Sequence, residues 1–209
     1  MDARCLSQAL AVTTLKWNAA ALSWAAAIAL CLAVGFWQTG HGLYIKAKAE
    51  VAQILLERAW QQTLTNGQPH KAWPWADAWP VAKLEIPALR KSHIVLSNTS
   101  GEALAFGPGH LLGSPLPGGH GTMVIAGHRD THFSFLRELE SDDVVTIATA
   151  DGTVRRYIVD GVDIVDSTHT QIDPGAETGI ALVTCYPFDA RERGPLRYVV
   201  FASPERDAI

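Results

Sequence analysis

The sequence predicts an all-β domain, a barrel or a sandwich, that follows a membrane-spanning segment and a linker helix. An uncharged apolar run covers residues 19–37, and after Pro80 short apolar stretches alternate with Gly and Pro. Many short strands with few helices are typical of barrels and sandwiches. The chain has 209 residues, of which 48% are hydrophobic, which suits one domain with an appendage. We divide it into a cytoplasmic tip and anchor (1–40), a linker helix (41–72) and a folded domain (73–209).

The apolar run is just long enough to cross a hydrocarbon core about 30 Å thick. Basic residues flank both of its ends, so the positive-inside rule determines the orientation only weakly. A single early span before a long domain favours a single-pass protein of the inner (cell) membrane with its domain in the periplasm. A cleaved signal peptide is an alternative, but the best cleavage candidate, Ala47-Lys48-Ala49, lies about ten residues past the run. A buried core helix is the third interpretation.

Residues 42–64 contain no Pro and many good helix formers, which predicts a helix that continues from the membrane and packs on the domain. Asn66-Gly67 and Pro69 predict its end. Residues 72–80 contain three Trp and two Pro, which indicates an extended segment lying on a hydrophobic surface.

Short apolar or alternating stretches, separated by turn residues, predict the strands of the domain. They cover residues 81–86, 93–96, 122–126, 144–148, 154–165, 180–183 and 197–202.

Composition excludes several classes of function. The net charge of −4 is spread along the chain with no basic stripe, so no nucleic-acid partner is expected. The sequence has no P-loop and no Gly-rich strand–helix fingerprint, so nucleotide binding has no support. The three cysteines, Cys5, Cys31 and Cys185, form no CxxC pair and no zinc-ligand pattern. Cys185 is therefore either a small buried hydrophobe or a reactive thiol.

Three local features carry the chemistry. Residues 124–130 contain a predicted strand that ends in Gly127, and His128 follows it directly. Residues 181–185 form another predicted strand, which ends in Cys185. Arg197 opens the last strand, twelve positions after Cys185. A thiol nucleophile needs a base or an imidazolium near it, and acyl transfer needs a donor for the developing oxyanion. Strand ends of a rigid barrel are suitable places to hold such groups.

In this order the features resemble the sortases, in particular those of Gram-negative, often marine, bacteria. The resemblance covers about residues 73–203. The family pattern before the cysteine is Thr-Leu-x-Thr-Cys, and here it reads Ala181-Leu182-Val183-Thr184-Cys185. The first Thr of the pattern is therefore Ala, whereas Thr184 and Cys185 are in place.

The resemblance implies an eight-stranded sortase β-barrel and a cysteine transpeptidase, of the cysteine-peptidase class of hydrolases, that needs no metal or organic cofactor. It implies cleavage of an LPxTG-like C-terminal sorting signal on a protein substrate, a thioester on Cys185, and transfer to an amine acceptor. His128 is then the general acid and base, and Arg197 binds the substrate backbone or the oxyanion. The loops at 107–119 and 167–179 are expected to shape the substrate groove.

Other residues compete for these roles. His132 is the nearest rival base, and a metal pair with His128 would need both rings on one helical face. Charge on an apolar strand is costly unless it is used, which favours Arg197 over arginines in the polar stretch before it. A hydroxyl nucleophile has no Gly-x-Ser-x-Gly elbow to support it. The competing arginines and hydroxyls are Arg191, Arg193, Ser134 and Thr184.

Two other classes of function stay open. One is a membrane-anchored thiol hydrolase that uses the same three residues and gives its product to water. The other is a non-catalytic periplasmic scaffold in which Cys185 is buried.

Overall fold

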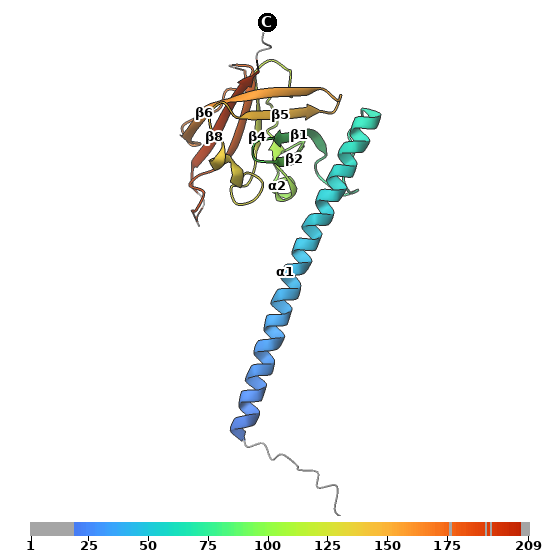
Figure 1. Cartoon of the computed structure of the whole chain (residues 1–209), viewed down its shortest axis with the longest axis vertical. Helices are drawn as coiled ribbons and strands as arrows, with labels where there is room; N and C mark the ends of the chain where they lie inside the picture. Colours follow the sequence, from blue (N-terminus) through green and yellow to red (C-terminus); the bar gives the residue numbers. More distant parts are fainter. Residues whose placement is uncertain (1–18, 176, 191, 193, 206–209) are drawn as a thin grey trace, which may run out of the picture. The chain divides into compact units, whose positions relative to one another are not determined.

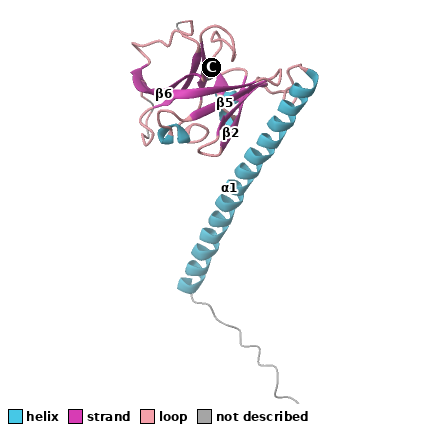
Figure 2. Cartoon of the chain, turned by 45° about the horizontal axis from the view of Figure 1, so that its top comes forward, coloured by secondary structure: helices cyan, strands magenta, loops and turns pink. Residues whose placement is uncertain are grey.

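The computed structural model describes residues 19–175, 177–190, 192 and 194–205. The chain forms two compact units, Met1–Lys48 and Ala49–Ile209. The second unit contains every strand, as Figure 2 shows by colour. The candidate site lies in this second unit.

Helix α1 (Ala19–Asn66) is one continuous helix of 48 residues, so the predicted anchor and linker helix form a single element. Its apolar part is long enough to cross a membrane, with a mean hydropathy of 1.5. The helix ends where Gly67, at φ 67°, donates its N–H to the Thr63 carbonyl at 2.8 Å. A glycine in the left-handed region is a common helix stop, which explains why Asn66-Gly67 predicts this boundary.

Eight strands close a barrel in the order β1-β2-β3-β4-β7-β8-β6-β5 (Figure 1). The prediction of an all-β barrel with short helices is confirmed, and every predicted strand lies within an observed one. The sequence pattern missed β3, because two residues give no periodicity. The strands are β1 (Pro80–Ile86), β2 (Lys91–Leu96), β3 (Gly109–His110), β4 (Thr122–Ala126), β5 (Val144–Thr149), β6 (Val154–Asp166), β7 (Gly179–Cys185) and β8 (Leu196–Pro204).

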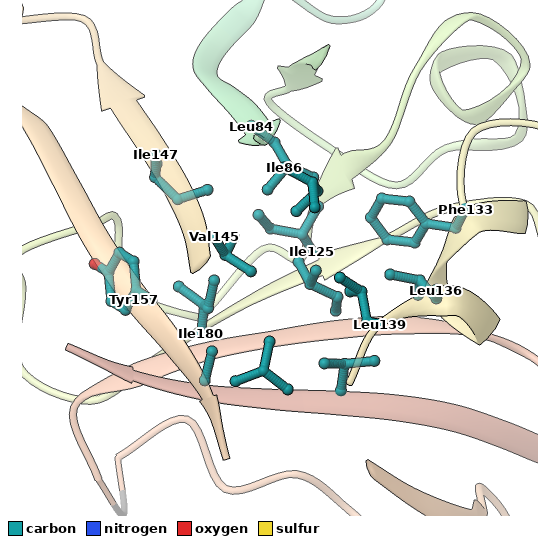
Figure 3. Close-up of a cluster of buried hydrophobic side chains, with 14 of the residues drawn as sticks. Leu84, Ile86, Ile125, Phe133, Leu136, Leu139, Val145, Ile147, Tyr157 and Ile180 are labelled. Atoms are coloured by element: carbon teal, nitrogen blue, oxygen red, sulfur yellow. The ribbon is translucent and has the colours of Figure 1, made fainter. Parts of the chain in front are cut away.

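Alternate residues of the strands fill the interior of the barrel. Figure 3 shows Ile86, Ile125 and Ile147, from β1, β4 and β5, converging with Phe133 and Leu136 at the 3₁₀ helix η1 (Ser134–Glu138). These side chains are fully buried. Burial of one such side chain stabilises a fold by roughly 1.5–3 kcal/mol. The strand positions between them face outward, and the candidate site residues occupy such outward positions.

A second cluster joins the end of α1 to the barrel. Leu56 and Trp60 of α1 pack against Leu96 of β2 and Ala103 of α2 (Gly101–Phe106). Trp60 is only 1% exposed. The predicted packing of the linker helix on the domain is therefore observed.

The Trp- and Pro-rich segment before β1 matches its prediction only in part. Trp73 packs edge-on against Phe106 with the ring centroids 4.8 Å apart, and Ala76 and Ala78 are buried. Trp75, however, is 78% exposed. Trp75 lies with Pro74 in a turn, so its indole is not packed on the domain as the pattern predicted.

Candidate active site

Strand register brings Cys185 and Arg197 together. β7 and β8 are antiparallel, and Cys185 lies directly opposite Arg197 at the end of the ladder. Directly opposed residues share one face of the sheet, with Cβ atoms about 4.5–5.5 Å apart. Cys185 is half-buried.

His128 follows the neighbouring strand at the same end of the sheet. β4 and β7 are parallel, with Ala126 opposite Val183. The Gly127 N–H extends this pairing by donating to the Val183 carbonyl at 3.0 Å. His128 comes next and is exposed, at the level that Cys185 occupies on β7. The three predicted residues thus lie at the same end of three adjacent strands: His128 two positions after β4, Cys185 at the last position of β7 and Arg197 at the second position of β8.

Thr184 ties the two strand ends together. Its hydroxyl donates to the Gly127 carbonyl at 2.7 Å, and its side chain is only 2% exposed. Because side chains alternate along a strand, Thr184 and Cys185 point to opposite faces. Thr184 is therefore a buried tether between β7 and the residue before His128, and its position argues against the alternative in which it is the nucleophile.

The bend that presents His128 requires a glycine. A Cβ atom on Gly127 would lie 2.7 Å from the nearest ring atom of Phe133. Phe133 is fully buried in the core and has no free direction in which to move. The Phe133 N–H also donates to the His128 carbonyl at 2.9 Å, so the buried ring anchors the turn that carries His128.

Arg197 is held by main-chain carbonyls and has a carboxylate nearby that the sequence did not identify. Its Nη1 donates to the carbonyls of Gly194 at 2.8 Å and Leu196 at 2.9 Å. Asp166 lies opposite Leu196 on β6. Hydrogen bonds from the side chain and backbone of Thr168, and then the charge of Arg197, hold the pKa of Asp166 below its usual range. The competing Arg191 and Arg193 lie outside the described residues.

His132 belongs to an aromatic cluster beside the site. Its ring meets that of His93 edge-on at 5.6 Å, and His93 stacks on Phe135 at 5.7 Å. Burial, followed by the positive charges of His132 and Lys91, lowers the pKa of His93 to about 4.

Burial is also the main cause that lowers the pKa of His132. A hydrogen bond with the Ala105 backbone opposes the shift, and the charge of His128 adds to it. His128 lies in a turn and not on a helix, so the helical geometry required for a metal pair with His132 is not present. Among the described residues, no group of three or more His, Cys, Asp or Glu side chains is placed to hold a metal ion.

An apolar strip runs along the outer face of the sheet toward Cys185, and we call it the outer strip. It is covered in part by Ile172, from the loop that joins β6 and β7. That loop is fixed to the start of β4, where Thr122 donates from its N–H to the Pro174 carbonyl and from its hydroxyl to the Glu177 carbonyl, each at 2.7 Å. The strip consists of Val124, Val165, Ala181, Val183, Val199 and Phe201.

A closed eight-stranded barrel with a thiol, an imidazole and a guanidinium at one end of three adjacent strands is the architecture of a cysteine acyltransferase. The chain belongs to the sortase family, because the family model for the sortase domain matches residues 84–205. Sortases are cysteine transpeptidases, so the class that the motifs predict is confirmed at the level of the family.

Individual relatives agree with this assignment. The chain is 33% identical over 120 residues to Sortase D of Bacillus subtilis (strain 168), an alignment that covers 56% of this chain and 60% of that protein. Sortase A from Corynebacterium diphtheriae is 30% identical, with a TM-score of 0.55 over 63% of each chain. A Clostridium perfringens Sortase D5 transpeptidase shares the fold with a TM-score of 0.60 at 20% identity, over 75% of this chain and 99% of that one. The chain thus spans less than two thirds of the curated relative.

Proposed function

We propose that the chain is a membrane-anchored cysteine transpeptidase that cleaves an LPxTG-like C-terminal sorting signal and transfers the acyl group to an amine. One observation carries this proposal. The register of β4, β7 and β8 places His128, Cys185 and Arg197 at the same end of three adjacent strands. Membership in a family of cysteine transpeptidases supports the same chemistry.

The first half of the reaction forms a thioester. The Cys185 thiol gives its proton to His128, and its sulfur attacks the carbonyl carbon of the Thr in the signal. The peptide C–N bond then breaks, and His128 passes that proton to the leaving amine. Arg197 donates hydrogen bonds to the oxyanion or to the neighbouring backbone carbonyl of the substrate. An incoming amine then attacks the thioester, loses its proton to His128, and expels the Cys185 sulfur.

The outer strip supports a peptide substrate. Val124, Ala181 and Val199 of the strip are buried, whereas Val165, Val183 and Phe201 are only partly buried, and Val183 lies two positions before Cys185. An extended peptide that places an apolar side chain on these partly exposed residues would bring a later carbonyl to the thiol. The loop that carries Ile172 forms one wall of this path. The sorting motif itself and the amine acceptor follow from the resemblance of residues 181–185 to the family pattern, as does the assignment to the Gram-negative type.

Helix α1 supports the anchor. Its apolar part suffices in length and composition to cross a membrane. A cytoplasmic tip and anchor (1–40), a linker helix (41–72) and a periplasmic domain (73–209) follow from this proposal. Deletion of residues 1–40 should release a water-soluble domain that keeps Leu56 and Trp60 on the barrel, as measured by partition between membrane and supernatant. A deletion variant that fails to fold would favour the core-helix interpretation.

Mass spectrometry of the full chain in detergent tests the chemistry. The protein is mixed with a panel of LPxTG-like peptides, with and without hydroxylamine, and Cys185→Ala is the control. A thioester on Cys185 that hydroxylamine converts to a peptide hydroxamate is the expected result. A thioester resolved only by water would favour the thiol hydrolase. No adduct across the panel, together with a Cys185 that resists iodoacetamide, would favour the scaffold.

A further inference from the structure

Arg129, the residue after His128, hydrogen-bonds to the loop that follows Cys185. Arg129 donates from Nη1 to the Pro187 carbonyl at 2.9 Å, and from Nη2 to the carbonyls of Ala190 at 2.5 Å and Glu192 at 3.3 Å. Each of these bonds joins residues about sixty positions apart in the sequence. A guanidinium presents donors in a rigid planar fork, which suits several carbonyls converging from one loop. The loop between β7 and β8 is thus held through its backbone by a residue from the β4 exit.

The same loop is bound at its other end by Arg197. The Arg197 guanidinium donates to the Gly194 and Leu196 carbonyls, and the Tyr186 N–H donates to the Leu196 carbonyl at 3.0 Å to close the base of the loop. Arg129 binds the first part of the loop and Arg197 the last part. The position of the Arg197 fork therefore depends on where Arg129 holds the loop.

The remaining contacts of this loop are weaker. Arg137 pairs with Asp189 at 3.8 Å and lies over the Phe188 ring at 5.4 Å. The Arg137 side chain is 51% exposed and that of Asp189 is 95% exposed, and such surface pairs contribute little to stability. Arg129 is better placed than Arg137 to hold the loop, because its hydrogen bonds are charge-assisted and their acceptors are backbone carbonyls.

We propose that Arg129 is a positioning residue that fixes the loop joining Cys185 to Arg197 and so keeps the Arg197 guanidinium in place on the strand position opposite Cys185. This inference rests on the proposed function for the role of Arg197. Lys at this position keeps the charge but carries its donors on a single nitrogen, so it cannot reproduce the fork in which Nη1 and Nη2 bind different carbonyls, and it should not rescue the position of the loop.

The test uses the full chain in detergent, in a Cys5→Ser, Cys31→Ser background so that Cys185 is the sole thiol. Arg129→Lys is compared with Arg137→Ala, which removes the weaker arginine contact with the same loop. Hydrogen exchange compares the exchange rates of the loop amides, Ala190 in particular, with those of the amides of β1 and β5. We expect exchange in the loop to rise about tenfold or more in Arg129→Lys while β1 and β5 stay unchanged. Arg137→Ala should stay within about threefold of the parent.

Kinetics separate positioning from general stability. With an LPxTG-like peptide, kcat for thioester formation should fall about ten- to hundredfold in Arg129→Lys, while KM changes less than about threefold. The inference would be overturned if the loop amides of Arg129→Lys exchanged at the wild-type rate. It would also be overturned if those amides exchanged faster while kcat stayed unchanged. Uniform exchange over the whole barrel with a lowered melting temperature would also overturn it, because Arg129 would then be merely structural.

A second readout keeps the inference testable if no peptide reacts and the proposed function fails. The rate of iodoacetamide alkylation of Cys185 should change by about threefold or more in Arg129→Lys, because movement of the loop that joins Cys185 to Arg197 changes the surroundings of the thiol. In an Arg197→Gln background the same substitution should have no further effect, since Arg129 acts through Arg197. Independent, multiplicative effects of the two substitutions would contradict the inference.

Discussion

Replacing Thr184 with Val tests whether the buried tether between β7 and β4 positions the candidate site. Val has nearly the shape of Thr and keeps the β-branched side chain that suits a strand. The change removes one hydroxyl, and with it the 2.7 Å hydrogen bond to the Gly127 carbonyl. Gly127 is buried, so its carbonyl gains no water in exchange.

The magnitude follows from the burial of both partners. A buried acceptor left without a donor costs about 1–3 kcal/mol. For a chain of this size, a loss in that range lowers the melting temperature by roughly 2–12 °C. The unsatisfied carbonyl also frees the end of β4 to move away from β7, which shifts His128 relative to Cys185. A misplacement of about 1 Å between reacting groups costs about a hundredfold in rate, so kcat should fall well beyond what stability explains.

Two variants sharpen the assay, which measures thermal unfolding and the rate of thioester formation on the same samples. Thr184→Ser keeps the hydroxyl and loses a methyl group, so it should lose about 1 kcal/mol of stability and keep most of the rate. Thr63→Val removes an equally buried hydroxyl that donates to the Ala59 carbonyl at 2.9 Å on α1, and it should lower stability without changing the rate. The reasoning is refuted if Thr184→Val reacts at the wild-type rate, or if Thr184→Ser is as slow as Thr184→Val.

Three further predictions concern other parts of the molecule. Because the pKa of His93 is lowered to about 4 by burial and then by His132 and Lys91, the neutral ring stabilises the fold above pH 6.5, and this stability is lost as the pH falls toward 4. Solvent screening of the partly exposed ring limits the loss to roughly 1–2 kcal/mol, and a His93→Gln variant should flatten this part of a denaturation profile against pH. Trp60→Ala should cost about 3–5 kcal/mol in chemical denaturation by opening a cavity between α1 and the barrel; a loss below 1 kcal/mol would mean that the helix end does not depend on this contact. Arg197→Lys should lower kcat by more than tenfold, because an ammonium lacks the forked donors, and near-normal rates would exclude the role proposed for Arg197.

Local sequence pattern predicted the strands and the candidate site because both depend on short-range features. β4 and β7 are continuous apolar runs with a sharp change of chemistry at one end, and that change marks His128 and Cys185. The motif resemblance then joined these ends to Arg197, which lies opposite Cys185 in the observed register. The catalytic roles of the three residues stay predictions.

Features that depend on distant pairing could not be predicted in the same way. β3 is only two residues long and exists because Leu96 and Ile125 offer backbone partners on both sides. His93 begins the predicted strand 93–96, but nothing near it in the sequence indicates that His132 and Phe135 pack against its ring. Its lowered pKa is a property of the folded barrel and not of residues 91–96.

Arg129 is the clearest example of a residue near the site whose contacts could not be predicted from the sequence. It follows the candidate base directly, and in the sequence it is only a polar residue in a turn. Its three acceptors are carbonyl oxygens, and a carbonyl carries no sequence signal because every residue has one. Motif reading detects side chains whose chemistry is unusual for their setting, such as the thiol of Cys185 at a strand end. A motif does not reveal a side chain whose role is to hydrogen-bond to backbone carbonyls. In a barrel whose site lies at strand ends, side chains of this kind determine where the connecting loops lie.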